Sequence, residues 1–149
     1  MHSQLVCSAT GQTYPADRLL NLSEAGKPLL AEYDLDAIKS RFTPEAVRRR
    51  TVRSMWRFWD VLPVDSPEDA VSLGEGLTPL LRCRRQGAFA AYPHLYVKDE
   101  AFNPTGSFKA RGMSAAITRA AALGVKVVAL PSAGNAGGGA TYYAGGAGL

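Results

Sequence analysis

Short apolar runs alternate with one long alanine-rich stretch in the second half of the chain. The apolar runs predict β-strands, and they cover residues 80–83, 94–98 and 126–130. The alanine-rich stretch at 106–123 predicts a helix, with Gly124 at its C-terminal cap. A strand, a helix and a further strand in this order indicate right-handed crossovers. We therefore predict an α/β fold with a parallel sheet and flanking helices.

The first 72 residues carry weaker signals. Residues 1–33 combine glycine and proline turns with two strand candidates, Leu5-Val6-Cys7 and Leu29-Leu30-Ala31. We expect residues 34–72 to form a helical connecting segment and residues 73–149 to begin the α/β domain. The connecting segment contains three helix start signals. Asp34 predicts a short helix through Ser40, and Ser66-Pro67 predicts a single turn. Thr43-Pro44-Glu45 predicts a helix that either ends before Ser54 or bends there and continues to Trp59.

Glycine is concentrated at the end of the chain. Seven of the fifteen glycines lie between Gly134 and Gly148. A glycine inside a helix costs about 1 kcal/mol relative to alanine. We therefore expect residues 138–149 to form a poorly packed or frayed helix.

The most informative stretch is Asn103-Pro104-Thr105-Gly106-Ser107-Phe108-Lys109-Ala110-Arg111-Gly112. It places Lys109 in the first turn of the predicted helix, directly after a turn. The start of a helix disfavours an ammonium group, and burial would lower the lysine pKa further. A free amine there could condense with an aldehyde to form a Schiff base. The alternative for this residue is an ordinary solvated helix lysine.

A second polar loop follows the third predicted strand, at residues 131–137. In parallel sheets, ligands bind at the carboxyl ends of strands. The loops at 99–107 and 131–137 both follow strand ends, so we expect them to face the same crevice. No P-loop or dinucleotide-binding glycine motif is present in the sequence.

Three motifs in order resemble the threonine synthases, a family of pyridoxal-phosphate enzymes of the tryptophan-synthase-β-like group (fold type II). They are Lys98-Asp99-Glu100 with the stretch 103–112, Pro131-Ser132-Ala133-Gly134-Asn135-Ala136-Gly137, and upstream Leu73-Gly74-Glu75-Gly76-Leu77-Thr78-Pro79-Leu80. The resemblance runs from about Leu5 to Leu149 and is sharpest between Gly74 and Gly137.

The resemblance implies cofactor roles for several of these residues. Lys109 would hold pyridoxal 5'-phosphate covalently and then move protons at the substrate carbons. Asn135 would donate a hydrogen bond to the phenolic oxygen of the cofactor, and its alternative role is an ordinary helix cap. Phe108 is expected in the core or as a wall of the cofactor pocket. The remaining residues that would shape the loop are Ser132, Gly134 and Ala136.

The resemblance also suggests substrate contacts on the preceding loops. The candidates are Glu75, Thr78, Asn103, Thr105 and Ser107. Turn and N-cap chemistry is the alternative for the polar groups around Ser107. For Arg111 we expect a salt bridge with Asp99 or Glu100 in preference to a substrate contact.

The implied reaction converts O-phospho-L-homoserine and water to L-threonine and phosphate. Family members are much longer, so this chain is expected to be an N-terminal portion that is inactive alone. Another fold-type-II lyase, such as threonine dehydratase or cysteate synthase, and a non-catalytic remnant remain open as alternatives. A homo-oligomer also remains open.

The N-terminal section resembles a degenerate zinc ribbon. Family members often carry two Cys-x-x-Cys pairs there. In this chain Cys7 is retained, and the other three positions correspond to Thr10, Leu22 and Ala25. Tetrahedral zinc requires four ligands, so we expect no metal.

Composition narrows the remaining function classes. Apolar residues make up 46% of the chain, and 17 basic and 13 acidic residues give a net charge of +4. The arginines of residues 48–57 are spaced through a predicted helix that also carries Met55, Trp56, Phe58 and Trp59, so we interpret them as its solvated face and expect no nucleic-acid partner. With two distant cysteines and no signal-peptide pattern or apolar run of about 18 residues, we expect a cytoplasmic protein without a membrane partner.

Overall fold

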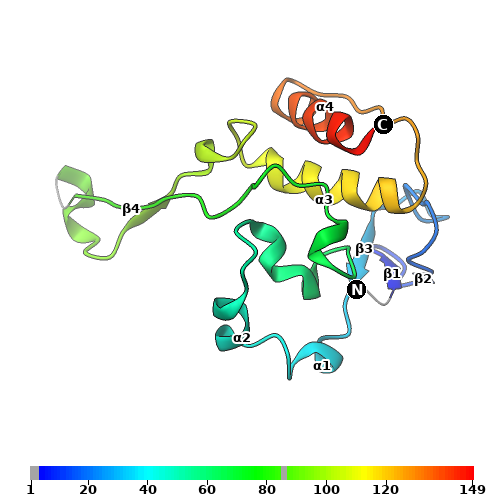
Figure 1. Cartoon of the computed structure of the whole chain (residues 1–149), viewed down its shortest axis with the longest axis horizontal. Coiled ribbons are helices and arrows are strands. Elements are labelled where there is room, and N and C mark those ends of the chain that lie inside the picture. Colours follow the sequence, from blue (N-terminus) through cyan, green and yellow to red (C-terminus); the bar gives the residue numbers. More distant parts are fainter. Residues whose placement is uncertain (1–3, 85–86) are drawn as a thin grey trace.

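Two adjacent helices, α3 (Lys109–Ala122) and α4 (Asn135–Ala147), form the centre of the computed structural model, which describes residues 4–84 and 87–149. They run in the same direction side by side (Figure 1). Their facing side chains form a core of Ala110, Ile117, Tyr143 and Ala144. The predicted helix at 106–123 is therefore confirmed, with a start at Lys109 instead of Gly106.

The glycine-rich helix α4 is well packed, so the expectation of a frayed helix was wrong. Tyr143 is fully buried between the two helices. Gly139 is also buried, and a Cβ atom built on it would lie 3.0 Å from Met113 Cγ of α3. The small residues of α4 allow close approach to α3, and this packing offsets the low helix propensity of glycine.

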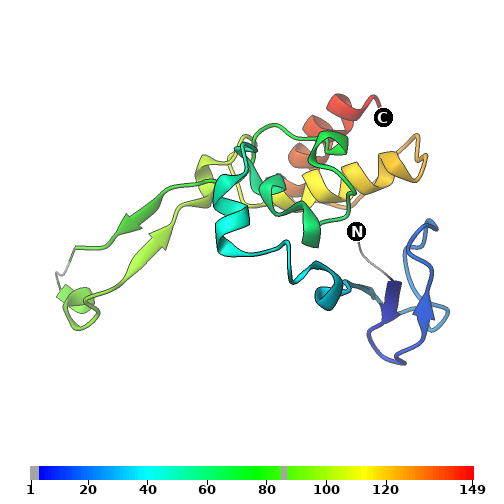
Figure 2. The same cartoon turned by 60° about the horizontal axis from the view of Figure 1, so that its bottom comes forward.

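The predicted parallel sheet is not formed by the described residues. Strands β4 (Leu80–Arg82) and β5 (Tyr96–Lys98) pair antiparallel, with Leu81 opposite Val97. They form a hairpin that projects from the helices (Figure 2). Residues 126–130 lie beside α4. They do not form a strand, because no described strand pairs with them. The described part of the chain is thus mixed α/β with antiparallel pairing.

The N-terminal section forms an antiparallel sheet in the order β2-β1-β3. Its strands are β1 (Gln4–Cys7), β2 (Thr13–Tyr14) and β3 (Leu29–Glu32). This confirms both strand candidates, whereas residues 1–3 of the section lie outside the described residues. Cys7 is buried with its Sγ 3.1 Å from Ser23 Oγ. Hydrogen bonds from Ser23 and Thr10 lower the pKa of the Cys7 thiol to about 6.

The connecting segment begins its helices at the predicted capping residues. Asp34 accepts from Ala37 N (2.9 Å) at the start of α1 (Leu35–Ile38), and Thr43 accepts from Ala46 N (3.2 Å) at the start of α2 (Pro44–Arg49). Helix α2 ends at Arg49, which confirms the expected end before Ser54. The 3₁₀ helices of the chain are η1 (Met55–Val61), η2 (Pro67–Asp69), η3 (Gly87–Ala91) and η4 (Glu100–Phe102).

The arginines of this segment do not form a uniform solvated face. Arg50 forms an ion pair with the buried Asp60 (2.6 Å), and its guanidinium lies 3.7 Å from the Trp59 ring centroid. Arg57 donates to Val47 O at 2.8 Å. These arginines hold η1 against α2, and the interpretation of a solvated face was wrong for them. In the described residues, no helix is both long and apolar enough to span a membrane.

The packing of α4 predicts opposite behaviour for two adjacent glycines. Gly138 is exposed, and a Cβ atom there meets nothing within 4 Å. We expect Gly138→Ala to raise the free energy of unfolding by roughly 0.5–1 kcal/mol. Gly139→Ala should give no such gain, because its Cβ presses on Met113. Urea unfolding followed by circular dichroism measures both, and equal stabilisation by the two variants would contradict this packing.

Candidate functional site

Lys109 is the first residue of α3. Its backbone N donates to Ser107 Oγ at 3.3 Å, and its side chain is partly buried. Its Nζ lies 4.8 Å from the ring centroid of Phe108. Among residues 4–84 and 87–149, no carboxylate forms an ion pair with this ammonium group. The amine is therefore available to a ligand.

The second candidate loop leads into α4. Gly134 has φ 140°, a conformation that favours glycine, and it turns the chain into the helix. Ser132 Oγ accepts from Gly134 N (3.0 Å) and Gly137 N (2.7 Å), so Ser132 caps α4. Asn135 is the first helical residue and is exposed, with Ala136 next to it.

The starts of α3 and α4 lie at the same end of the helix pair. A Cβ atom on Gly139, one turn after Asn135, would lie 4.0 Å from Lys109 O. Helix N-termini carry partial positive charge and free N–H groups, so this end of the pair favours anionic ligands. The structure thus brings the two predicted cofactor loops to the same end, although no parallel sheet places them there.

This end of the molecule is open to solvent. Phe108 is 59% exposed, so its interpretation as a core residue was wrong. Hollows of about 700 and 630 Å³ lie elsewhere. The first hollow lies between the N-terminal section and α3 near Arg119, and the second lies between residues 126–130 and α4. Neither hollow is lined by Lys109 or Asn135.

Glu75 is completely buried in a network of neutral donors. Its carboxylate accepts from Trp56 Nε1 (2.7 Å), Ser114 Oγ (2.6 Å), Tyr143 OH (2.8 Å) and Leu73 N (2.9 Å). Burial would raise the pKa of Glu75, but hydrogen bonds from Ser114, the backbone and Tyr143 hold the pKa below its ordinary value. Sequence reasoning missed Ser114 and Tyr143, because they lie 39 and 68 residues from Glu75 and no sequence pattern connects them to it.

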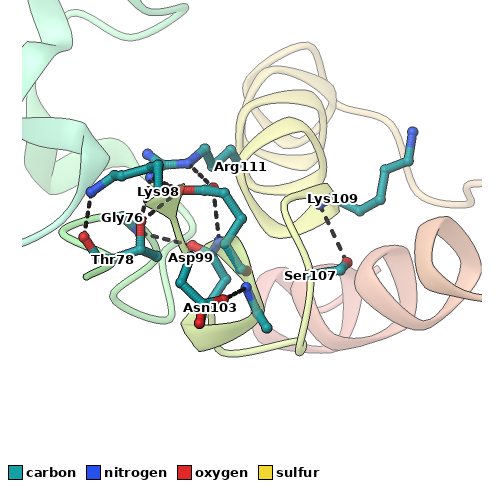
Figure 3. A network of polar contacts seen from close by, with 10 residues as sticks. Gly76, Thr78, Lys98, Asp99, Asn103, Ser107, Lys109 and Arg111 are labelled. Carbon is teal, nitrogen blue, oxygen red and sulfur yellow. Dashed lines mark hydrogen bonds and ion pairs between the residues drawn. The ribbon is translucent and has the colours of Figure 1, made fainter. Parts of the chain in front are cut away.

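A second network includes Thr78, Asn103 and Arg111 (Figure 3), and all three donate to the carboxylate of Glu100. Arg111 donates to its carboxylate through Nε (2.6 Å) and Nη2 (2.8 Å), which confirms the predicted salt bridge. Thr78 Oγ1 donates at 2.6 Å and Asn103 Nδ2 at 3.0 Å. The hydrogen bonds from Arg111 and Thr78 outweigh burial and lower the pKa of Glu100 to about 2. The carboxylate is therefore ionised at neutral pH.

The predicted substrate residues divide into two groups. Glu75, Thr78 and Asn103 are buried, and their polar atoms bond to other residues of the chain. Ser107 is buried and accepts from the backbone N of Lys109. Thr105 differs, because its buried Oγ1 has no hydrogen-bond partner among the described residues.

Comparisons with known proteins agree with the resemblance. Residues 71–149 match a family model described as "Pyridoxal-phosphate dependent enzyme". The chain is 43% identical over 129 residues to a threonine synthase of Methanocaldococcus jannaschii, covering 87% of this chain and 32% of that protein. It is 36% identical over 146 residues to a threonine synthase of Methanosarcina acetivorans, and this match covers 97% of this chain and 35% of that protein. The chain spans about a third of the length of these relatives.

The Glu75 network predicts unequal effects for two neighbouring tyrosines. Tyr143→Phe removes one donor from a buried carboxylate, so we expect a loss of about 1.5–3 kcal/mol in the free energy of unfolding. Tyr142→Phe is the matched control, because Tyr142 is 65% exposed and should be neutral. Equal stabilities of the two variants in urea unfolding would show that the Tyr143 hydroxyl contributes nothing.

Proposed function

The chain belongs to the pyridoxal-phosphate dependent enzyme family, and from this premise we propose that it carries the cofactor-binding residues of a threonine synthase. One observation carries the proposal. Lys109 begins α3 with an amine free of any ion pair among the described residues, at the helix end that it shares with Asn135. The names of the relatives support the choice of threonine synthase within the family.

The residues at this end fit such a cofactor. Its aldehyde requires an unpaired amine, which Lys109 offers, and its phenolic oxygen requires a donor, which the exposed Asn135 amide can supply. Two helix N-termini at the same end favour the negative charge of its phosphate and of a substrate carboxylate. When bound, pyridoxal phosphate supplies an aldehyde for the substrate amine and a ring that accepts electron density from the substrate carbons.

We assign the residues of the chain the following roles. The Nζ of Lys109 would hold the cofactor, and as a free amine it would accept and return protons at the substrate carbons. The Asn135 side chain donates to the phenolic oxygen. Phe108 covers one side of the site, and the remaining loop residues that shape it are Ser132, Gly134 and Ala136.

For the substrate, O-phospho-L-homoserine, we favour Thr105 as a contact. Its buried hydroxyl lacks a partner among residues 4–84 and 87–149, so a ligand could satisfy it. The other predicted contacts are engaged within the chain, and we assign them to the support of the loops. They are Glu75, Thr78, Asn103 and Ser107.

The finer organisation of the fold belongs to the same proposal. We propose that residues 126–130 join a parallel sheet in a longer protein, since Val127 is β-branched and 81% exposed. The proposed sections are 1–33, 34–72 and 73–149, with the first as a ribbon without zinc. The described cysteines, Cys7 and Cys83, are both free, which supports a cytoplasmic location.

Trapping the cofactor tests the role of Lys109. Borohydride reduction of the chain after incubation with pyridoxal phosphate, followed by peptide mapping, should place the label on Lys109. The exposed Lys126 is an internal control and should carry little label. A label spread evenly over the lysines, or one that survives Lys109→Arg, would exclude Lys109 as the cofactor residue.

A hybrid enzyme tests the reaction. The aligned segment of the Methanocaldococcus jannaschii relative is replaced by the matching residues of this chain, and threonine formed from O-phospho-L-homoserine is measured. We expect threonine from the hybrid and a loss of at least about a thousandfold with Lys109→Ala, because general acid–base catalysis alone contributes 10²–10⁴-fold. An unchanged rate with Lys109→Ala would contradict the assignment. We expect no threonine from residues 1–149 alone.

A further inference from the structure

Helix α3 has only a long side-chain cap, in which Ser107 Oγ accepts from Lys109 N at 3.3 Å. Its N-cap residue, Phe108, has helical backbone angles and makes no capping hydrogen bond through its side chain. The next two N–H groups of this turn, of Ala110 and Arg111, donate to Ser107 O and Phe108 O at 3.2 Å, so all of these bonds are local. Lys109 sits in this turn, so an interaction with another segment would fix its backbone relative to the rest of the chain.

That interaction is a two-point ion pair between Arg111 and Glu100. The Nε–Oε2 and Nη2–Oε1 distances are 2.6 and 2.8 Å, and both side chains are partly buried. Such paired, charge-assisted hydrogen bonds fix geometry as well as adding energy. Arg111 lies in the same turn as Lys109, so the pair attaches that turn to η4.

Glu100 is itself held in place by the 73–79 loop and by Asn103. Thr78 Oγ1 donates to Glu100, and Asn103 links Glu100 to the 73–79 loop by accepting from Gly76 N at 3.0 Å. A Cβ atom on Gly76 would lie 3.2 Å from Arg111 Nη1 and 2.8 Å from Met55 N. Glycine is therefore required by the close approach to the Met55 backbone, and a side chain here would also crowd the guanidinium group of Arg111.

We propose that Glu100, acting through Arg111, is a positioning residue for Lys109. Figure 3 shows the Lys109 side chain directed away from this network, so the network fixes the backbone and leaves the amine free. This inference rests on the proposed cofactor role of Lys109, which it extends to a residue that touches neither cofactor nor substrate.

The test compares Glu100→Gln with two controls in the 149-residue chain. Glu45→Gln makes the same chemical change in an exposed ion pair with Arg48, and Ile38→Val weakens a buried site in α1. Pyridoxal phosphate is titrated, trapped with borohydride and quantified at Lys109. We expect Glu100→Gln to raise the half-saturating concentration about tenfold, equivalent to about 1.4 kcal/mol, while both controls match the wild type.

Amide hydrogen exchange gives a readout that does not depend on the cofactor. In Glu100→Gln, the amides of residues 109–112 should exchange faster, while those of α4 should not change. Thr78→Val removes one hydrogen bond to Glu100 and should cause a smaller increase in exchange at residues 109–112. It is the milder variant to use if Glu100→Gln unfolds.

The outcomes separate the two proposals. Wild-type trapping at Lys109 with equal trapping in Glu100→Gln would overturn the positioning role and leave the cofactor role intact. Wild-type exchange rates at residues 109–112 in both variants would also overturn positioning. A wild-type chain that is not labelled at Lys109 would overturn the cofactor role and, with it, the inference.

Discussion

The buried carboxylate of Glu75 is the constraint on which the arrangement of this chain depends. An ionised carboxylate inside a protein is costly unless every lone pair finds a donor. Here the donors come from η1, α3, α4 and the backbone of the 73–79 loop. Each donor must reach the same two oxygen atoms, so these segments can converge in few ways. The helix pair is therefore fixed by a polar centre as well as by its apolar contacts.

The 73–79 loop connects this centre to the candidate site. Glu75 points into the helix pair, whereas Gly76 and Thr78 bond to the group around Glu100. Leu77, between them, has φ 50°, an uncommon conformation for a residue with a side chain. Such a conformation costs on the order of 1–3 kcal/mol and persists only where neighbouring contacts impose it. The bonds on either side of Leu77 supply those contacts, so the loop holds η4 and the start of α3 at a set distance from Glu75.

Local signals in the sequence predicted local structure well. The caps at Asp34 and Thr43, the helix that carries Lys109, and the salt bridge of Arg111 all depend on residues close together in the chain. The failures concern distant partners. A strand pattern at 126–130 could not show that no described strand lies beside it. The glycines of α4 predicted a poorly packed helix, because the sequence does not reveal that Met113 and Tyr143 fill the space beside them. The donors of Glu75 escaped sequence analysis for the same reason, since they lie up to 68 residues away from it.

The candidate site depends on these helices more than on strands. The hairpin of β4 and β5 exposes every one of its paired residues, and an isolated two-stranded hairpin is at best marginally stable in water. It therefore cannot position Lys109 by itself. The polar groups that hold the start of α3 and the apolar contacts between α3 and α4 both lie among the described residues. Since Lys109 and Asn135 are placed by these contacts, their common position at one end follows from helix packing, the buried network of Glu75 and the partly buried network of Glu100.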